Sequence, residues 1–182
     1  MRNPEETRRR LLEAATAEFA AYGIAGARVD RIAEGAGCNK QSIYGYFGSK
    51  DGLFEAVLDT IVARAVSEVP VDSHDLAGYA GRVFDWYGDN PEVLRLWNWM
   101  QLEQGDPKQM SEAMLAARTD KREKVRAAQQ AGVITNAIPA EQLLGFVNRL
   151  ASTQIDYCSL DSCERSALRA SLVEAVRRLV AP

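Results

Sequence analysis

The chain has 182 residues and carries 22 Lys and Arg against 25 Asp and Glu, a net charge of −3. This length suffices for one small domain and one larger core, because such a chain buries about 70% of its unfolded surface. No apolar run approaches the ~20 residues of a membrane span, and the charged start MRNPEETRRRLL is unlike a signal peptide. We therefore expect a cytoplasmic protein with no membrane partner.

Few side chains could support catalysis or bind a metal. There is one histidine, His74, whereas a di-iron bundle needs two Glu-x-x-His motifs and a zinc protease needs HExxH. The GAG at residues 35–37 lacks the GxGxxG spacing of a phosphate-binding loop. We predict no catalytic residue, no metal site and no cofactor, although a helical enzyme without recognisable motifs stays open.

The three cysteines, Cys38, Cys158 and Cys163, are an odd number and fit reduced thiols better than a disulfide framework. Cys38 is expected to pack as a small apolar side chain. Cys158 and Cys163 lie five residues apart across a predicted turn between helices. Oxidation of this pair could form a redox switch, which stays open as an alternative, although two ordinary thiols would show the same spacing.

Positive charge is concentrated at the start of the chain. Residues 1–50 hold eight Lys and Arg against six Asp and Glu, a net charge of +2, and the remainder carries −5. A basic N-terminal segment on an otherwise acidic chain would turn that segment toward the phosphates of DNA, although a solvated helix surface would show a similar balance.

The first predicted helix begins after Asn3. Asn at the cap, Pro4 at the first helical position and Glu6 at the third are typical of a capping-box start. The helix is expected to end before Gly23. Apolar residues recur at three- and four-residue steps and predict a buried stripe of Leu12, Ala15, Phe19 and Tyr22.

Two short helices joined by a glycine turn are predicted between Val29 and Leu53. Ile32 and Ala36 lie four residues apart on one face of the first helix, which can pack against its neighbour. Gly37 lies just past its end and can take the left-handed backbone that a sharp reversal needs. This is the anatomy of a helix-turn-helix DNA reader.

The second short helix supplies the side chains that a DNA reader needs. Asn39 is placed to cap it, and it is expected to run from about Lys40 to Phe47. At ~100° per residue, its buried side carries Ile43, Tyr46 and Phe47, and the opposite side carries Lys40, Gln41, Tyr44 and Gly45. Lys can donate to guanine, and Gln can bond adenine bidentately. An ordinary helical hairpin with a solvated polar edge is the alternative.

These residues resemble the N-terminal signature of the tetracycline-repressor (TetR) family of bacterial transcriptional regulators. The signature has IA in helix two, an AG turn, YxYF at the end of helix three, and SK followed by an acidic residue and Leu. The matching residues are Ile32, Ala33, Ala36, Gly37, Tyr44, Tyr46, Phe47, Ser49, Lys50, Asp51 and Leu53. The resemblance covers roughly residues 5–55. Arg28 stands where the family usually has Thr, and Cys38 where it usually has Val.

The resemblance implies a helix-turn-helix domain of three helices at residues 1–50, followed by a helical ligand-binding and dimerisation domain at residues 51–182. It implies that the start of the first helix touches the DNA backbone and that Lys50 binds a phosphate, which free amides at a helix start would favour. The expected DNA contacts are Thr7, Arg28, Asn39, Lys40, Gln41, Ser42, Tyr44, Gly45, Tyr46 and Lys50. Arg28 could instead be simply solvated.

The rest of the chain is predicted to be helical, with no alternation typical of strands, which gives an all-α fold of about nine helices. Ser49 is placed to cap a fourth helix that continues to about Glu68 and stops before Pro70. This helix is the expected transmission element between the domains. Five further helices are expected at residues 73–87, 91–104, 107–131, 140–160 and 163–180.

The last two predicted helices carry apolar stripes at helical spacing. The stripes contain Leu143, Leu144, Val147 and Leu150 in one helix, and Leu168, Leu172 and Val176 in the other. A monomeric core could bury both, whereas the resemblance implies that they pair with their counterparts in a homodimer. A two-fold dimer would present two reading helices to the half-sites of a palindromic double-stranded DNA operator.

Aromatic residues gather in the middle of the chain, where they could line a pocket or fill a core. We expect a small, moderately apolar effector to contact Tyr79, Phe84, Trp86, Trp97, Met100, Gln101 and Gln104. The predicted function is a ligand-responsive repressor whose apo dimer binds the operator. Ligand binding would tilt the fourth helix, although the ligand could also act as a corepressor.

Overall fold

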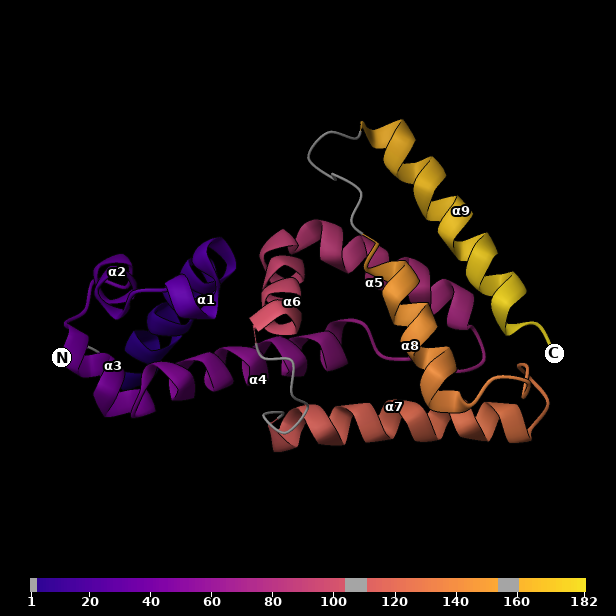
Figure 1. Cartoon of the computed structure of the whole chain (residues 1–182), viewed down its shortest axis with the longest axis horizontal. Coiled ribbons are helices and arrows are strands. Elements are labelled where there is room, and N and C mark those ends of the chain that lie inside the picture. Colours follow the sequence, from indigo (N-terminus) through magenta and orange to yellow (C-terminus); the bar gives the residue numbers. More distant parts are fainter. Residues whose placement is uncertain (1–2, 104–110, 154–160) are drawn as a thin grey trace. The chain divides into compact units, whose positions relative to one another are not determined.

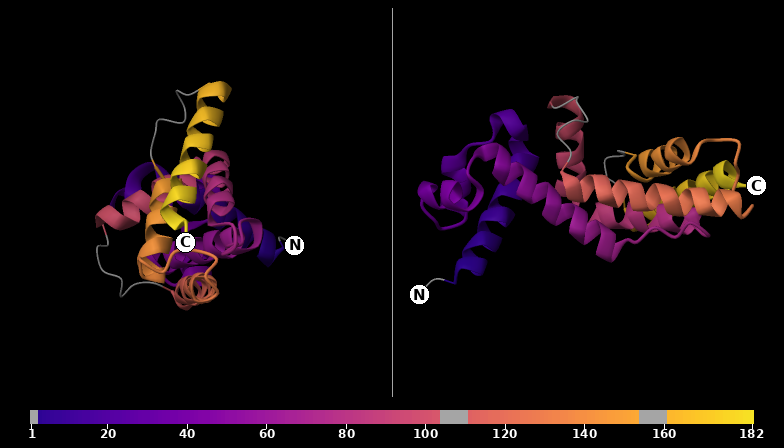
Figure 2. Two further views of the ribbon diagram at one scale, coloured as in Figure 1. Left: turned by 90° about the vertical axis from the view of Figure 1, so that its right-hand side faces the viewer. Right: turned by 90° about the horizontal axis from the view of Figure 1, so that it is seen from below.

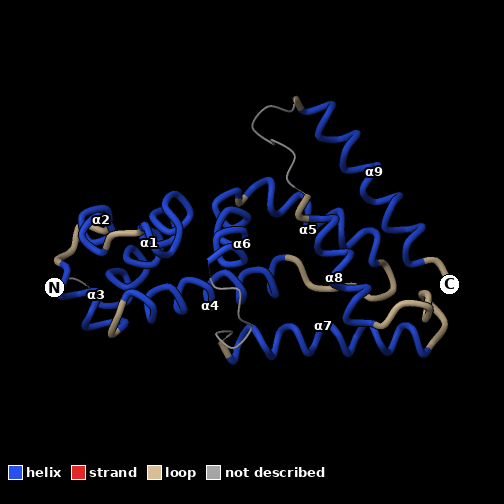
Figure 3. Tube along the Cα trace, in the orientation of Figure 1, coloured by secondary structure: helices blue, strands red, loops and turns tan. Residues whose placement is uncertain are grey.

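The computed structural model describes residues 3–103, 111–153 and 161–182 (Figure 1). These residues form helices joined by loops and contain no strand (Figure 3). The helices are α1 (Pro4–Gly26), α2 (Val29–Gly35), α3 (Lys40–Phe47), α4 (Lys50–Glu68), α5 (Leu76–Asp89), α6 (Pro91–Glu103), α7 (Glu112–Gln130), α8 (Ala140–Ala151) and α9 (Ser162–Val180). The all-α fold class is therefore confirmed. None of the helices in these ranges is both long enough and apolar enough to span a membrane.

The chain divides into two compact units, which are described separately. The first unit comprises Met1–Ala63 and Pro91–Met114, and the second comprises Arg64–Asn90 and Leu115–Pro182. The first unit therefore holds α1, α2, α3, α6 and most of α4. The second holds α5, α8, α9 and most of α7, and the helices of both units can be followed in Figure 2.

In the first unit, α1 packs against both α2 and α6, and α2 packs against α3. The centre of this core is formed by Leu11, Ala15, Phe19, Ile32, Ile43, Leu53 and Phe54, all of which are buried. The rings of Phe19 and Phe54 meet edge to face with their centroids 5.1 Å apart. This packing holds the helix-turn-helix segment against α1.

One residue of the predicted α1 stripe is not buried: Tyr22 is 52% exposed, whereas Leu12, Ala15 and Phe19 lie in the core. The backbone of Gly23 (φ 71°, ψ 178°) interrupts α1 one residue later, at the place where the helix was expected to end. The Tyr22 ring packs instead under the guanidinium of Arg31, 4.1 Å from the ring centroid. The burial predicted from helical periodicity is therefore wrong for Tyr22, the last residue before the kink.

In the second unit, α5 packs against α8 and α9, which also pack against each other. Its core contains Tyr79, Phe84, Val125, Leu143, Val147 and Val176. Asp75 caps α5, because its Oδ1 accepts from the Gly78 amide at 2.8 Å, and the helix therefore begins slightly later than residue 73. Asp161 caps α9 in a capping box with Glu164.

Candidate nucleic-acid interface

Helix α3 is held in place by its two ends and by one buried side chain. At its start, Oδ1 of Asn39 accepts from the Ser42 amide at 2.8 Å and from the Ser42 hydroxyl at 2.9 Å. Its end is set by Gly48, whose φ of 75° favours glycine. Ile43 is fully buried. The predicted bounds and cap of this helix are confirmed, and the polar side chains of Asn39 and Ser42 serve the cap.

The outer face of α3 has the predicted composition. Lys40, Gln41, Tyr44 and Gly45 are all exposed. A Cβ placed on Gly45 would meet no protein atom within 4 Å, so this part of the helix backbone is open to a large partner. Exposed donors beside a glycine are what close approach to base edges requires.

Tyr46 was expected on the buried side of α3 but is 40% exposed. Its hydroxyl donates to the carbonyl of Pro4 at 3.2 Å, and its ring packs beside that of Phe47 with centroids 6.1 Å apart. The hydrogen bond to the start of α1 draws the ring to the rim of the core. Tyr46 therefore links α3 to the first turn of α1.

Lys40 forms an ion pair with Asp30 of α2, with Nζ 3.0 Å from the carboxylate. The hydrogen bond from Lys40 lowers the pKa of Asp30, and the same bond raises the pKa of Lys40. Both side chains are exposed, so a DNA phosphate or base can compete for the ammonium.

Helix α2 is anchored by a carboxylate from α1. Its N-cap residue, Arg28, makes no cap with its own side chain; the Arg28 amide donates instead to Oε1 of Glu18 at 2.8 Å. The same oxygen accepts from Nε of Arg31 at 2.8 Å, and Nη2 of Arg31 lies 2.6 Å away. Glu18 is only 8% exposed. Burial raises the pKa of Glu18, but the hydrogen bonds from Arg31 and Arg28 more than offset this, and the pKa lies below its ordinary value.

The sequence analysis did not select Glu18. The available signal was an acidic residue three positions after Ala15, beside the apolar stripe of α1. The structure shows that Glu18, from another helix, accepts a hydrogen bond from the backbone amide of Arg28, the N-cap residue of α2.

Two of the residues expected to contact the DNA backbone are less available to it than the resemblance implies. Lys50 donates to the carbonyls of Ala25 and Ala27 at 3.3 and 3.1 Å, near the C-terminal end of α1. An ammonium has three donors, so one is left for a phosphate. Thr7 is buried, and its hydroxyl offers little surface to DNA.

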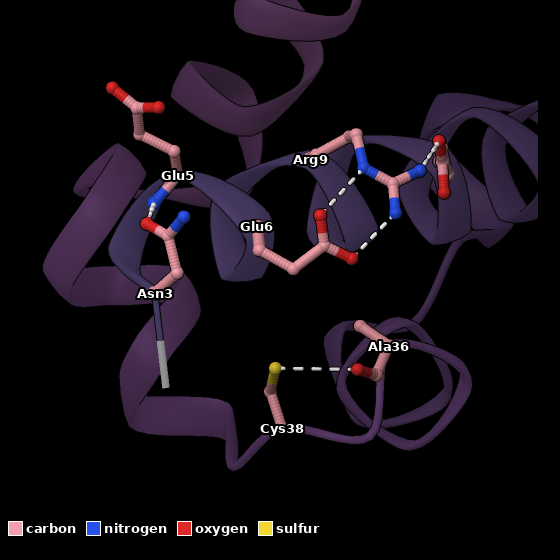
Figure 4. Close-up of polar contacts among 7 residues, drawn as sticks. Asn3, Glu5, Glu6, Arg9, Ala36 and Cys38 are labelled. Atoms are coloured by element: carbon pink, nitrogen blue, oxygen red, sulfur yellow. Dashed lines mark hydrogen bonds and ion pairs between the residues drawn. The ribbon is translucent and has the colours of Figure 1, made fainter. Parts of the chain in front are cut away.

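The start of α1 is shown in Figure 4. Asn3 caps the helix by accepting from the Glu5 amide at 3.1 Å, but Glu6 does not complete a capping box. Glu6 instead binds Arg9 at 2.6 and 3.0 Å.

The sulfur of Cys38, which Figure 4 also shows, lies 3.4 Å from the Ala36 carbonyl, in keeping with a packed thiol.

The expected effector residues are divided between the two units. Tyr79, Phe84 and Trp86 belong to α5 and are buried in the second unit, where Nε1 of Trp86 donates to Glu68 at 2.6 Å. The expected residues of α6, which belong to the first unit, are Trp97, Met100 and Gln101. Trp99 of the same helix donates to the Ala20 carbonyl at 3.3 Å. Gln104 lies outside the described residues.

The expected dimerisation stripes pack largely within the chain. The buried members are Leu143, Leu144, Val147, Leu172 and Val176, and the partly buried members are Leu150 and Leu168. On α8 the exposed side includes Phe146, which is 49% exposed.

Cys163 is exposed, and Cys158 lies outside the described residues. Within the described ranges, no group of His, Cys, Asp and Glu could hold a metal ion.

Comparison with known families identifies both parts of the chain. A family described as bacterial regulatory proteins of the tetR family matches residues 11–57, and one described as the tetracyclin repressor-like C-terminal domain matches residues 75–178. The chain belongs to the TetR family. Regulators of this family bind operator DNA, usually as dimers, and respond to small-molecule effectors.

Individual relatives agree with this assignment. The HTH-type transcriptional repressor SCO4008 of Streptomyces coelicolor is 40% identical over 98% of this chain and 97% of its own length. The repressor NicS of Pseudomonas putida is 30% identical over 78% of this chain and 66% of its own. The crystal structure of transcriptional regulator SCO4942 from Streptomyces coelicolor is 35% identical, with a TM-score of 0.82 over 96% of this chain and 98% of its own.

The chain is therefore a DNA-binding transcriptional regulator with repressors among its relatives, and it is not an enzyme. The comparisons support neither the enzyme nor the redox alternative. Of the expected DNA-reading residues, Lys40, Gln41, Tyr44 and Gly45 share one exposed face.

Proposed function

We propose that two copies of this TetR-family regulator bind a palindromic operator and that a small, moderately apolar effector releases them from it. The observation that carries the proposal is the exposed face of α3, where Lys40, Gln41 and Tyr44 surround the open backbone of Gly45. A helix held at both ends can present these donors to the major groove without losing much conformational entropy on binding.

The residues that we propose to act on DNA have distinct roles. Gln41 bonds a base edge and sets sequence preference, whereas Tyr44 and Lys50 bind the phosphate backbone. Gly45 allows the helix backbone to come close to the groove. Phosphate contacts position the protein and base contacts specify the sequence, so loss of each has a different signature.

The dimer is proposed to form through the outer faces of α8 and α9. The stripe of Leu143 and Val147 is buried within the chain, so the surface left for a second copy is the side of α8 that carries Phe146. An exposed phenylalanine on a C-terminal helix suits an interface between identical chains.

Release from DNA is proposed to act through α4. This helix follows α3 after Gly48 and Ser49, and the Ser49 hydroxyl accepts from the Gly52 amide at 2.9 Å. The hydroxyl of Ser111, which precedes α7, donates to Asp59 of α4 at 2.5 Å. A ligand releases the protein from DNA only if it binds more tightly to the conformation that does not fit the operator than to the conformation that does.

The test begins with selection of bound duplexes from random DNA, followed by anisotropy titrations at several salt concentrations. Gly45→Ala is the sharpest variant, because alanine stabilises a helix by ~1 kcal/mol relative to glycine and the added methyl meets no protein atom. We expect unchanged or higher stability with roughly tenfold weaker operator binding, which is about 1.4 kcal/mol. Operator binding at full strength by Gly45→Ala would refute close approach at α3.

Two further variants separate base reading from backbone binding. Gln41→Ala should change the preferred base at one position by ~1–3 kcal/mol, whereas Tyr44→Ala should weaken binding to all sequences. Absence of salt-dependent DNA binding would reject the function.

Light scattering tests the proposed dimer. Phe146→Glu should shift the protein to the 20.1 kDa monomer, and a wild-type protein that is monomeric at micromolar concentration would reject the dimer.

A further inference from the structure

A chain of hydrogen bonds in the second unit starts at a lysine. Nζ of Lys121, on α7, donates to the hydroxyl of Tyr79 on α5 at 3.1 Å and lies 5.6 Å from the centre of the ring. The Tyr79 hydroxyl donates to Oδ1 of Asn148 on α8 at 3.3 Å. The amide of Asn148 donates to the Leu144 carbonyl at 2.9 Å. One chain of hydrogen bonds that begins at an ammonium therefore links three helices of the second unit.

The hydrogen-bond partner that the described residues provide for this ammonium, the Tyr79 hydroxyl, is neutral. Among the described residues, no carboxylate lies within ion-pair distance of Lys121, and the adjacent Asp120 is paired with Lys124 at 2.7 Å. Tyr79 is 1% exposed, and burial raises its pKa to about 12, so its hydroxyl is neutral at pH 7. Burial lowers the pKa of Lys121. The charge of Asp120 opposes this effect but does not outweigh it. A partly buried cation without an ion-pair partner costs folding free energy, and such groups are concentrated at functional sites.

The properties of Lys121 and of the neighbouring helices indicate what would offset the charge. Lys121 is partly rather than fully buried, and its ammonium has two donors besides the one given to Tyr79. The apolar residues buried on α5 and α8 include Val83, Phe84, Leu144 and Val147. A partly buried ammonium on helices with apolar buried faces suits the single charge of a carboxylate on an apolar molecule better than the double charge of a phosphate.

We propose that Lys121, with Tyr79 and Asn148 behind it, binds the carboxylate of an apolar monocarboxylic acid. This inference rests on the proposed effector response and names the chemical class of the effector. Lys121 donates to the carboxylate, while Tyr79 and Asn148 hold the ammonium in place through their hydrogen bonds. The apolar body of the acid packs against the side chains of the second unit.

The experiment compares the thermal unfolding of three proteins: wild type, Lys121→Met and the control Lys124→Met on the same helix. Each is measured alone, with sodium benzoate or octanoate, with benzamide or octanamide, with inorganic phosphate, and with sodium chloride at equal ionic strength. We expect Lys121→Met to unfold at a higher temperature than wild type without ligand. The two carboxylates should stabilise wild type and Lys124→Met but not Lys121→Met, and the amides should stabilise none of them.

The proposal is overturned if the carboxylates shift all three proteins equally or shift none, or if phosphate stabilises wild type more than they do. Should Lys121→Met fail to fold, Tyr79→Phe keeps the ring and removes the hydroxyl, and it should reduce the carboxylate-induced shift. An unchanged shift in Tyr79→Phe would then refute the proposed site. Because the readout contains no DNA, failure of operator binding would count against the proposed function alone.

Discussion

Removing the carboxylate of Glu18 should destabilise the first unit more than removal of any exposed acid on α1. Glu18→Ala leaves the Arg28 amide without its acceptor and Arg31 without its partner, where the present distances are 2.8 Å to each. Glu18→Gln keeps an oxygen for the Arg28 amide but loses the charge. The control is Glu13→Gln, since Glu13 forms only an exposed ion pair with Arg9.

The magnitude follows from the burial of the two partners. A hydrogen bond to a charged group contributes about 1.5–3 kcal/mol, and Glu18→Ala removes the bonds to both the Arg28 amide and Arg31. Arg31 is partly exposed and can be rehydrated, so the lower end applies to its bond. We expect a loss of roughly 2–3 kcal/mol for Glu18→Ala and about 1 kcal/mol for Glu18→Gln. At ~2–4 °C per kcal/mol, the alanine variant should unfold roughly 4–12 °C lower.

Urea unfolding at several pH values gives the assay. The pKa of Glu18 in the folded protein lies below the ordinary value of 4.5. The ionised carboxylate therefore stabilises the folded state above pH 4.5, and this contribution is lost as the pH falls through the pKa of the folded protein. The difference between wild type and Glu18→Gln should therefore be constant near neutral pH and shrink below about pH 4.5. Equal losses for Glu18→Gln and Glu13→Gln, or a difference that does not vary with pH, would refute the reasoning.

Two further predictions concern cations that we propose to contact DNA. Lys50→Ala should lower the free energy of unfolding in urea by ~1 kcal/mol, besides weakening DNA binding, because the ammonium binds two carbonyls near the end of α1. An effect on DNA binding alone would contradict this. Asp30→Asn should tighten operator binding several-fold in low-salt anisotropy titrations and have little effect in high salt, because it frees Lys40 and removes a negative charge beside the phosphates. Equal affinities of both proteins in low salt would contradict it.

Local sequence signals predicted the bounds and the buried side of α3 well. The bounds of α3 follow from Asn39 at its start and Gly48 at its end, and Ile43 is buried as its register requires. These interactions join residues a few positions apart, so the order of the residues contains them. The same holds for the break of α1 at Gly23.

Periodicity was less successful at the edges of the core. Tyr22 and Tyr46 both have the spacing of buried residues, yet both are exposed, because Arg31 stacks on one and the Pro4 carbonyl binds the other. A period shows which residues share a helix face. It does not show where that face leaves the core.

The sequence by itself determined the helical class, the helix-turn-helix segment and its exposed polar face, since these depend on caps, glycines and a 3.6-residue period. Only the tertiary structure decided that Glu18 binds the Arg28 amide at the start of α2, that the stripe of Leu143 and Val147 is buried within the chain, and that Lys121 contacts Tyr79. Tyr79 and Lys121 are 42 residues apart, and no local pattern links them. Their contact exists because apolar burial brings separate helices together and places whatever polar groups they carry side by side.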